Sequence, residues 1–564
     1  MAEFVWSYTS GTSSRPLLGM TIGDCFEEIA ARFPDRDAVI SRHQNTRLSY
    51  GELRRLARQC ARGLIALGFR KGDRLGIWSP NCAEWTVTQL ATAYAGIVLV
   101  NINPNYRVHE LEYVLRQSGC SGLLVSEVFR SSDYPGMVAQ LIPELELGSD
   151  FSSARLASIK AVVSLGASTR PGIKAWGDLL ARGDEISEET LDAMLAETQF
   201  DDPINIQYTS GTTGFPKGAT LSHHNILNNG YFVAELMNFT EQDRLVIPVP
   251  LYHCFGMVMA NLGCITHGAA MIYPSPIFDP AAVLQAVQEE KATALYGVPT
   301  MFIAELEHPD FGKYDLTSLR TGIMAGAPCP VEVMKKVNTL MHMSEVEIAY
   351  GMTETSPVSF QTRADAPLDK RVSTVGQVHP HVEVKIVDPV TGKILKTGEN
   401  GELCTRGYSV MLGYWENPEA TAKSIDEAGW MHTGDLAVMD SEGYVNIVGR
   451  IKDMIIRGGE NIYPREVEEY LYTNGKVADV QVIGVPDRKY GEEVMAWIKL
   501  RPGVEMSEEE VKEFCRGRIA HYKVPRYVKF VDGFPMTVTG KIQKFVMREE
   551  SVRELGLEGP EKTA

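Results

Sequence analysis

A single run of eleven residues constrains this chain more than any other segment. The run Tyr208–Gly218 reads Tyr-Thr-Ser-Gly-Thr-Thr-Gly-Phe-Pro-Lys-Gly and follows the apolar residues Ile204 and Ile206. Its glycines let backbone amides approach a polyanion closely, its hydroxyls donate hydrogen bonds, and its lysine adds a positive charge. The run therefore predicts a phosphate-binding loop directly after a buried strand.

This loop differs from the P-loop of kinases and GTPases. In that motif a glycine precedes the lysine and a hydroxyl residue follows it. Here Pro216 precedes Lys217 and Gly218 follows it. The spacing disfavours a Walker-type nucleoside triphosphatase, although composition alone also fits an ordinary solvated Gly/Ser/Thr loop.

The overall charge limits the partners. A net charge of −17 over 564 residues argues against nucleic-acid binding and against binding to anionic membrane surfaces. The same charge repels a free nucleotide at long range. A nucleotide site must therefore rely on local positive charge and on backbone amide dipoles.

Cysteine usage and the hydropathy pattern indicate the compartment. The nine cysteines are odd in number and include no Cys-x-x-Cys pair, so neither a zinc site nor a disulfide framework is indicated. The start Met-Ala-Glu-Phe-Val-Trp lacks a signal pattern, and the most apolar window, 91–100, is shorter than the roughly 20 residues of a membrane span. We expect a cytoplasmic protein without an integral membrane segment; a mitochondrial matrix protein trimmed of its leader would look the same.

The first part of the chain alternates helical and strand patterns. Leu53, Leu56, Cys60 and Leu64 recur at helical spacing. Short apolar runs predict buried strands at 74–77, 122–125, 161–165 and 245–249. This alternation favours an α/β fold with largely parallel sheets.

The pattern of apolar and turn-forming residues changes after residue 382. Short strands separated by Gly, Asp and Asn turns predict a β-rich subdomain over 382–448. A charged connector at 449–453 leads to a compact unit with predicted helices at 464–472 and 507–520 and strands at 480–485, 495–500 and 527–531. We therefore expect a large N-terminal domain, 1–450, and a small mobile α+β C-terminal domain, 451–564.

Five motifs in order resemble those of the adenylate-forming (AMP-binding) superfamily of acyl-activating enzymes. They are 208–218, Tyr350–Thr355, Trp430–Asp435, Gly449–Tyr463 and Thr539–Lys544. The resemblance covers nearly the whole chain. Within the superfamily, the runs Met411–Trp415 and Ile456–Pro464 look most like acyl-CoA synthetases that are medium-chain fatty-acid–CoA ligases.

The resemblance implies a two-step reaction. A carboxylate attacks the α-phosphorus of ATP to give acyl-AMP and pyrophosphate, and the thiol of coenzyme A then displaces AMP. Two unit charges brought to ~4 Å at an effective dielectric of ~20 repel by about 4 kcal/mol, and a cation at the meeting point removes that cost. By resemblance Lys541 is this cation, carried on the small domain.

The resemblance also assigns the nucleotide-binding residues. The phosphate loop contributes Thr209, Ser210, Gly211, Thr212, Thr213, Gly214 and Lys217. Tyr350 stacks on adenine, with Gly326, Ala327 and Pro328 as the opposite wall, and Gly351 and Thr353 are further nucleotide-binding residues. Asp435 accepts hydrogen bonds from the ribose, and Arg450 supplements it with fork-shaped donors. Glu354, with Thr209, is the expected site of Mg²⁺.

The remaining implied assignments concern movement and the other two substrates. Lys452 occupies the hinge, and the coenzyme A channel is lined by Arg457, Gly458, Gly459 and Glu460. His253 lies near the substrate carboxylate, and the acyl pocket is lined by His253, Met257, Gly263, Ala325 and Thr353. Catalysis is assigned to Lys541, His253 and Glu354.

Several alternatives stay open on sequence grounds. An aryl-acid (benzoate-type) CoA ligase shares every nucleotide motif, and a luciferase-like oxidation needs the same first step. An adenylation domain that feeds a carrier protein is disfavoured. A non-catalytic nucleotide-binding module is disfavoured because Lys541, Glu354, Lys217 and Asp435 occur together. A homodimer is left open.

Overall fold

The computed structural model describes residues 5–129, 132–148, 151–167, 170–209, 216–327, 329–458, 460–536 and 542–557. These residues form two compact units. The larger takes its described residues from Thr9–Val384 and Thr405–Met431, and the smaller from Met1–Tyr8, Lys385–Cys404 and His432–Ala564. The domain boundary expected near residue 450 stays a prediction.

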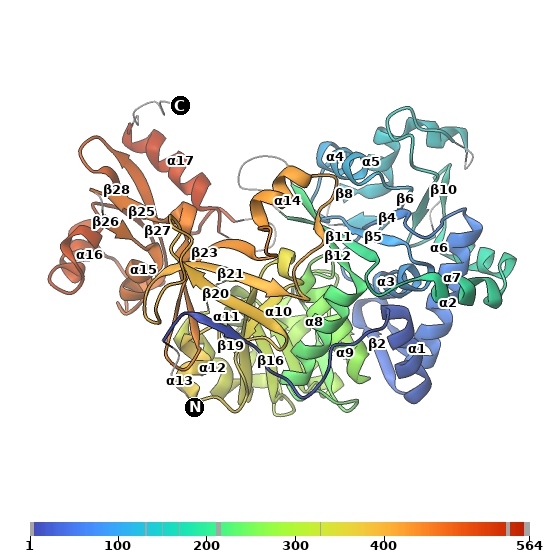
Figure 1. Cartoon of the computed structure of the whole chain (residues 1–564), viewed down its shortest axis with the longest axis horizontal. Helices are drawn as coiled ribbons and strands as arrows, with labels where there is room; N and C mark the ends of the chain where they lie inside the picture. The colour runs from blue at the N-terminus through green and yellow to red at the C-terminus, as the bar shows by residue number, and fades with distance from the viewer. Residues whose placement is uncertain are drawn as a thin grey trace. The chain divides into compact units, whose positions relative to one another are not determined.

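The first sheet of the larger unit has eight strands in the order β10-β9-β6-β4-β5-β11-β12-β22 (Figure 1). Neighbours from β10 to β11 run parallel, whereas β12 and β22 add antiparallel pairs. The strands are, in chain order, β4 Arg74–Trp78, β5 Val98–Asn101, β6 Gly122–Val125, β9 Ala161–Ser164, β10 Ile173–Lys174, β11 Pro203–Thr209, β12 Lys217–Ser222 and β22 Gly413–Tyr414.

Both faces of this sheet are buried, which explains its continuous apolar strands. Along β6, Leu123 and Val125 pack into one hydrophobic cluster, while Leu124 between them packs into another. Helices α4 (Val108–Ser118) and α5 (Tyr134–Leu141) lie on one side of the sheet, and α2 (Tyr50–Ala66) and α3 (Ala83–Ala95) lie on the other (Figure 1).

The second sheet has nine strands in the order β19-β18-β17-β16-β15-β13-β14-β2-β3. The strands are β2 Asp37–Ser41, β3 Thr46–Ser49, β13 Arg244–Val246, β14 Ala270–Tyr273, β15 Ala294–Gly297, β16 Thr321–Ala325, β17 Glu345–Gly351, β18 Val358–Gln361 and β19 Gln377–Val378. Pairing from β2 through β17 is parallel.

One layer of helices serves both sheets. It contains α1 (Ile22–Arg32), α8 (His223–Leu236), the π-helical segment η4 (Phe255–Leu262) and α9 (Gly263–His267). Their apolar side chains join residues of both sheets in a single core cluster. The outer face of the second sheet is covered by a separate cluster that includes α10 (Pro280–Glu290), α11 (Pro299–Leu306) and α12 (Val331–Leu340).

Two further sheets account for most of the described strand residues of the smaller unit. The first has the order β1-β20-β21-β23-β24, with β1 Tyr8–Ser10, β20 Val382–Val387, β21 Gly401–Gly407, β23 Met431–Met439 and β24 Val445–Arg450. The second has the order β26-β25-β28-β27, with β29 on β28; its strands are β25 Ile455–Arg457, β26 Glu460–Ile462, β27 Val477–Asp487, β28 Gly491–Leu500 and β29 Tyr527–Phe530. Helices α15 (Pro464–Tyr472), α16 (Glu508–Cys515) and α17 (Lys544–Leu555) complete it.

The α/β class with a small α+β unit is confirmed, and two predicted elements end well short of their expected bounds. The strand expected over 245–249 ends at Val246 because Pro248 has no backbone N–H for the ladder. The helix expected over 507–520 ends at Cys515, and Gly517 follows with a φ of +67° that a continuing helix cannot hold. The helical segment at 257–263 is π-helical up to Leu262.

Two histidines are fully buried in the larger unit. His223 opens α8, and its Nδ1 accepts a hydrogen bond of 3.1 Å from the amide of Ile22. The Nδ1 of His379 lies 3.3 Å from the hydroxyl of Tyr408. Burial lowers the pKa of each imidazole from 6.5 to about 3.

These histidines should make the fold sensitive to acid. In the unfolded chain each binds a proton below pH 6.5, but the folded chain cannot until about pH 3. Each histidine should therefore remove about 1.4 kcal/mol from the free energy of unfolding between pH 7.5 and 5.5. In urea titrations at both pH values, His379→Gln should lose less stability on acidification than the wild type, by about that amount. The control His109→Gln, at an exposed position on α4, should keep the wild-type loss. An equal loss in all three proteins would contradict this account.

Candidate active site

The predicted phosphate loop is the connection of a β-hairpin. Its two flanking residues, Thr209 at the end of β11 and Lys217 at the start of β12, are antiparallel partners. The carbonyl of Pro216 accepts a hydrogen bond of 3.0 Å from the Tyr113 hydroxyl, which fixes the returning arm. Ser210, Gly211, Thr212, Thr213 and Gly214 lie outside the described residues.

A buried carboxylate stands beside the base of this hairpin. Glu354 lies in the short 3-10 turn Thr353–Thr355 that follows β17. Its Oε1 accepts a hydrogen bond of 2.9 Å from the Tyr414 hydroxyl, and the Thr209 hydroxyl lies 3.4 Å away. The fold thus brings Glu354 and Thr209 together as predicted. One carboxylate and one hydroxyl fit Mg²⁺, which takes oxygen ligands and keeps most of its waters.

Tyr414 is a site residue that the sequence reasoning missed. It lies in β22, whose pairing with β12 sets Tyr414 opposite Ala219. The ammonium of Lys217 lies 5.0 Å from the centre of its ring, a cation–π distance. Burial, and then the charge of Glu354, raises the pKa of the Tyr414 phenol, so it stays protonated and donates. Tyr414 belongs to the run Met411–Trp415, which in the sequence analysis indicates only the resemblance to acyl-CoA synthetases.

The predicted adenine wall lies at the carboxyl ends of two parallel strands. Gly326 and Ala327 follow β16, while Tyr350 and Gly351 end β17, and Ala325 and Ala349 pair just before them. Adjacent carboxyl ends of parallel strands are where open α/β sheets bind ligands. Pro328 lies outside the described residues.

The backbone requires glycine at two of these nucleotide-binding positions, 326 and 351. Gly326 has a φ of +86°, in the left-handed region that side chains avoid. At Gly351 a Cβ would lie 1.6 Å from the carbonyl oxygen of Pro357, so no side chain fits.

The predicted acyl-pocket residues belong to the helical layer between the sheets. His253 lies two residues before the π-helical segment, and its ring centre lies 4.3 Å from that of Tyr252. Met257 is buried, and its sulfur accepts hydrogen bonds from the side-chain amides of Gln207 and Asn101 at 3.0 and 3.2 Å. These contacts fix Met257 in place.

The other predicted pocket residues are tightly packed or half-buried. Ala325 is buried in the same core cluster as Met257. Gly263 opens α9, where an added Cβ would lie 3.3 Å from the Gly230 carbonyl oxygen of α8. Thr353 is half-buried. Their role in binding an acyl chain stays a prediction.

A cysteine beside this region is excluded as a nucleophile. Cys254 is buried and its thiol contacts the side-chain oxygen of Gln207 at 3.1 Å. Burial, and then the charge of Glu354, raises the pKa of this thiol to about 12. Because the thiolate is the reactive form, Cys254 is inert at neutral pH.

In the smaller unit, Asp435 and Arg450 face each other across β23 and β24. They are register partners, and the Arg450 Nε lies 3.0 Å from Asp435 Oδ1. The amide of Asp435 donates to the Thr433 hydroxyl at 3.1 Å, and Gly434 between them has a φ of +70°. The fold therefore joins the two residues predicted for ribose binding.

The predicted hinge and channel residues follow directly. Lys452 lies in a 3-10 turn after β24, where it is exposed. Arg457 forms two hydrogen bonds, of 2.6 and 3.0 Å, with the carboxylate of buried Glu493. This pairing ties Arg457 to its own sheet.

The turn beyond Arg457 is only partly described. Gly458 has a φ of +60°, and Glu460 is exposed in β26. Gly459 and Lys541 lie outside the described residues. The hinge, channel and Lys541 assignments stay predictions.

Within the described part of the chain, no helix combines the length and the apolar character needed to cross a bilayer.

Comparisons with known proteins agree with this geometry. Residues 26–415 match the family described as AMP-binding enzyme, and residues 466–541 match the AMP-binding enzyme C-terminal domain. YngI of Bacillus subtilis (strain 168) is 51% identical over 96% of this chain and 99% of its own. The medium-chain acyl-CoA ligase ACSF2, mitochondrial, of Danio rerio is 46% identical over 98% of this chain and 91% of its own. The anthranilate CoA ligase AuaEII, solved with anthranoyl-AMP, superposes with a TM-score of 0.85 at 26% identity, covering 96% of this chain and 99% of that one.

The two contacts of Tyr414 can be separated by substitution. Tyr414→Phe keeps the ring beside Lys217 and removes the hydrogen bond to Glu354, whereas Tyr414→Leu removes both. A hydrogen bond to a charged group is worth about 1.5 kcal/mol or more, so the Phe variant should bind ATP with Mg²⁺ about tenfold more weakly. Calorimetric titrations with Mg²⁺ and with EDTA check this. The Phe variant should match the wild type in EDTA, while the Leu variant is weaker in both. Wild-type affinity of Tyr414→Phe for ATP with Mg²⁺ would contradict the assigned role.

Proposed function

The chain belongs to the AMP-binding enzyme family, and from this premise we propose that it is an ATP-dependent ligase that joins medium-chain fatty acids to coenzyme A. The carboxylate and ATP give acyl-AMP and pyrophosphate, and the thiol of coenzyme A then gives acyl-CoA and AMP. The observation that carries the proposal is the meeting of Glu354 with the base of the phosphate loop, in a chain similar to a medium-chain acyl-CoA ligase along almost its whole length.

The first step brings two anions together. In the proposed mechanism, the loop amides and Lys217 bind the β- and γ-phosphates, where their charges offset part of the repulsion. Glu354 and Thr209 would hold Mg²⁺, which would supply positive charge to offset the negative charge of the phosphates. Lys541 provides the positive charge where the carboxylate oxygen meets the α-phosphorus.

The nucleoside is positioned by groups whose charge and shape are fixed in advance. Asp435 accepts hydrogen bonds from the ribose hydroxyls, and Arg450, whose Nε lies 3.0 Å from Asp435 Oδ1, adds hydrogen-bond donors beside it. Tyr350 stacks on adenine. Because Tyr350 and Gly351 end a strand of the parallel sheet, β17 fixes their backbone in advance.

The second step needs a different arrangement. We assign Lys452 as the hinge that absorbs the change in backbone angles. The glycines at positions 458 and 459 then give the narrow pantetheine arm of coenzyme A a passage. The acyl chain is placed against the buried layer near His253 and Met257, where each methylene removed from water contributes about 0.8 kcal/mol.

The compartment and assembly belong to the same proposal. We place the enzyme in the cytoplasm, with the mitochondrial matrix as the alternative because the Danio rerio relative is named mitochondrial. A homodimer is compatible with the proposal.

An aryl-acid CoA ligase is the second candidate. It is favoured by the similarity of the fold to an anthranilate CoA ligase. The sequence identity to that protein is 26%, against 46% to the medium-chain ligase, so the fatty-acid assignment leads.

The role of Lys541 can be tested by separating the half-reactions. Lys541→Ala should reduce acid-dependent pyrophosphate release by at least about 100-fold, because the group that offsets the developing negative charge is lost. Thioester formation from supplied acyl-AMP should largely survive. Lys499→Ala, at an exposed position of β28, serves as the control and should keep both activities. Equal loss of both half-reactions in Lys541→Ala would count against this role.

The substrate class follows from a panel of acids. Pyrophosphate release and acyl-CoA formation should be measured with straight-chain, branched and aromatic acids. We expect a maximum among medium straight chains, since the predicted pocket is apolar. A maximum among aromatic acids would replace the fatty-acid assignment, and no turnover with any acid would favour a non-catalytic nucleotide-binding module.

A further inference from the structure

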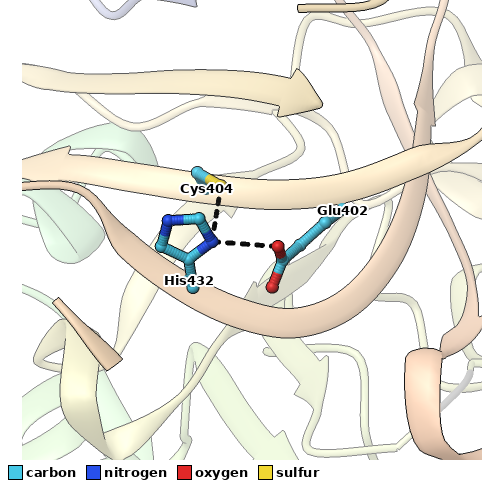
Figure 2. A group of neighbouring side chains, drawn as sticks. All are labelled: Glu402, Cys404 and His432. Atoms are coloured by element: carbon cyan, nitrogen blue, oxygen red, sulfur yellow. Dashed lines mark hydrogen bonds and ion pairs between the residues drawn. The ribbon is translucent and has the colours of Figure 1, made fainter. Parts of the chain in front are cut away.

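Three side chains with metal-binding atoms converge on neighbouring strands of the smaller unit (Figure 2). Glu402 and Cys404 are two residues apart in β21, so their side chains point to the same side of the sheet. His432 lies on the adjacent strand β23. The Nδ1 of His432 lies 2.9 Å from Glu402 Oε2 and 3.6 Å from Cys404 Sγ. Figure 2 shows the imidazole turned toward both partners.

The spacing of these atoms fits a small tetrahedral ion. The ligand atoms all lie within 4.8 Å of one another. Zinc bonds of about 2.0–2.3 Å at tetrahedral angles place donor atoms roughly 3.3–3.8 Å apart. The two distances from His432 Nδ1, 2.9 and 3.6 Å, lie near this range and the third pair of donors lies within 4.8 Å, so side-chain movements of up to about 1 Å would bring all three donors into place.

The donor types favour zinc over magnesium. A thiolate and an imidazole are soft or borderline ligands that suit Zn²⁺, whereas Mg²⁺ takes oxygen ligands. This distinguishes the cluster from the oxygen-only pair Glu354 and Thr209. Cys404 is fully buried, while the side chains of Glu402 and His432 are 13% and 34% exposed, which lets a water complete the coordination.

The surroundings already support the carboxylate. The amide of Gly434 donates to Glu402 Oε1 at 3.3 Å, so the ligand oxygen Oε2 is held on the side facing His432. The Thr433 hydroxyl donates to the Leu403 carbonyl at 2.7 Å and ties the same two strands together. Such outer contacts orient the ligands of metal sites.

We propose that Glu402, Cys404 and His432 form a zinc site that clamps β21 to β23. When Zn²⁺ binds, the Cys404 thiol releases its proton to solvent. The neutral His432 imidazole, whose Nδ1–H donates to Glu402, changes tautomer through solvent: Nδ1 gives up its proton, Nε2 takes one up, and Nδ1 binds the ion, with no net proton change at the imidazole. The ion takes the place of the hydrogen bond between His432 and Glu402, and the bond from Gly434 to Glu402 is kept. The site does not depend on the reaction that the enzyme catalyses.

Cobalt provides a direct test, because Co²⁺ adopts zinc geometry and absorbs visible light. Titration of the metal-free full chain with Co²⁺ should give tetrahedral ligand-field bands and a thiolate-to-cobalt charge-transfer band at one ion per chain. Zn²⁺ should abolish both. The charge-transfer band should disappear in Cys404→Ala, persist in the control Cys82→Ala at another buried cysteine, and weaken in His432→Asn. Absence of these bands in the wild type, or their persistence in Cys404→Ala, would overturn the site.

A thermal measurement covers the case in which a variant is poorly folded. A ligand that binds only the folded chain raises its unfolding temperature. One equivalent of Zn²⁺ should therefore raise the wild-type Tm by several degrees, EDTA should reverse this, and His432→Asn should show no rise. His432 is partly exposed, so this variant should fold as the wild type does. An equal rise in the wild type and in His432→Asn would contradict the proposal.

Discussion

The carboxylate of Glu354 is the point at which three distant parts of the chain meet. It is buried, and a buried charge is costly unless it is paired or hydrogen-bonded. The hydroxyls of Thr209 and Tyr414 approach it from β11 and β22, and the backbone carbonyl of Glu354 accepts a hydrogen bond of 2.9 Å from the amide of Met411. The hairpin that bears the phosphate loop and the turn after β17 are thereby held in one arrangement. A bound cation would satisfy the remaining negative charge, so this arrangement prepares the site for a metal–nucleotide complex.

The layered fold explains why the polar groups lie where they do. Parallel strands buried on both faces are largely apolar along their length, with the hydrogen-bonded Glu347 of β17 as an exception, so the polar groups of the predicted site lie at or beyond the strand ends. In the second sheet, β16 and β17 end side by side with Ala325 opposite Ala349, and the predicted adenine-binding residues follow within a few positions. In the smaller unit, polar residues are brought together by antiparallel pairing instead. Asp435 and Arg450 become neighbours only through the register of β23 with β24.

Local patterns were sufficient to predict much of this architecture. The strand over 122–125 and the helix over 464–472 have the predicted bounds because short apolar runs and a proline-initiated amphipathic pattern are local signals. The family was recognised from its motifs and is confirmed. Tyr414 was missed because its partners, Glu354 and Lys217, are 60 or more positions away in sequence. The cluster of Glu402, Cys404 and His432 was missed for the same reason: without a Cys-x-x-Cys pair, only strand pairing reveals it. Element ends failed where a single proline or glycine overrode a longer apolar pattern.

The π-helical segment Phe255–Leu262 makes the local structure depend on how many residues this part of the chain contains. Its hydrogen bonds span five residues instead of four, which accommodates an extra residue within the same axial rise. Loss of one residue would return the segment to ordinary helical winding and leave the helix beyond it in nearly the same orientation. Relatives that differ here by a single insertion or deletion would therefore present different side chains beside His253 while keeping the same sheets. Chain length in this segment, as well as residue type, thus determines which side chains line the region of the predicted acyl pocket.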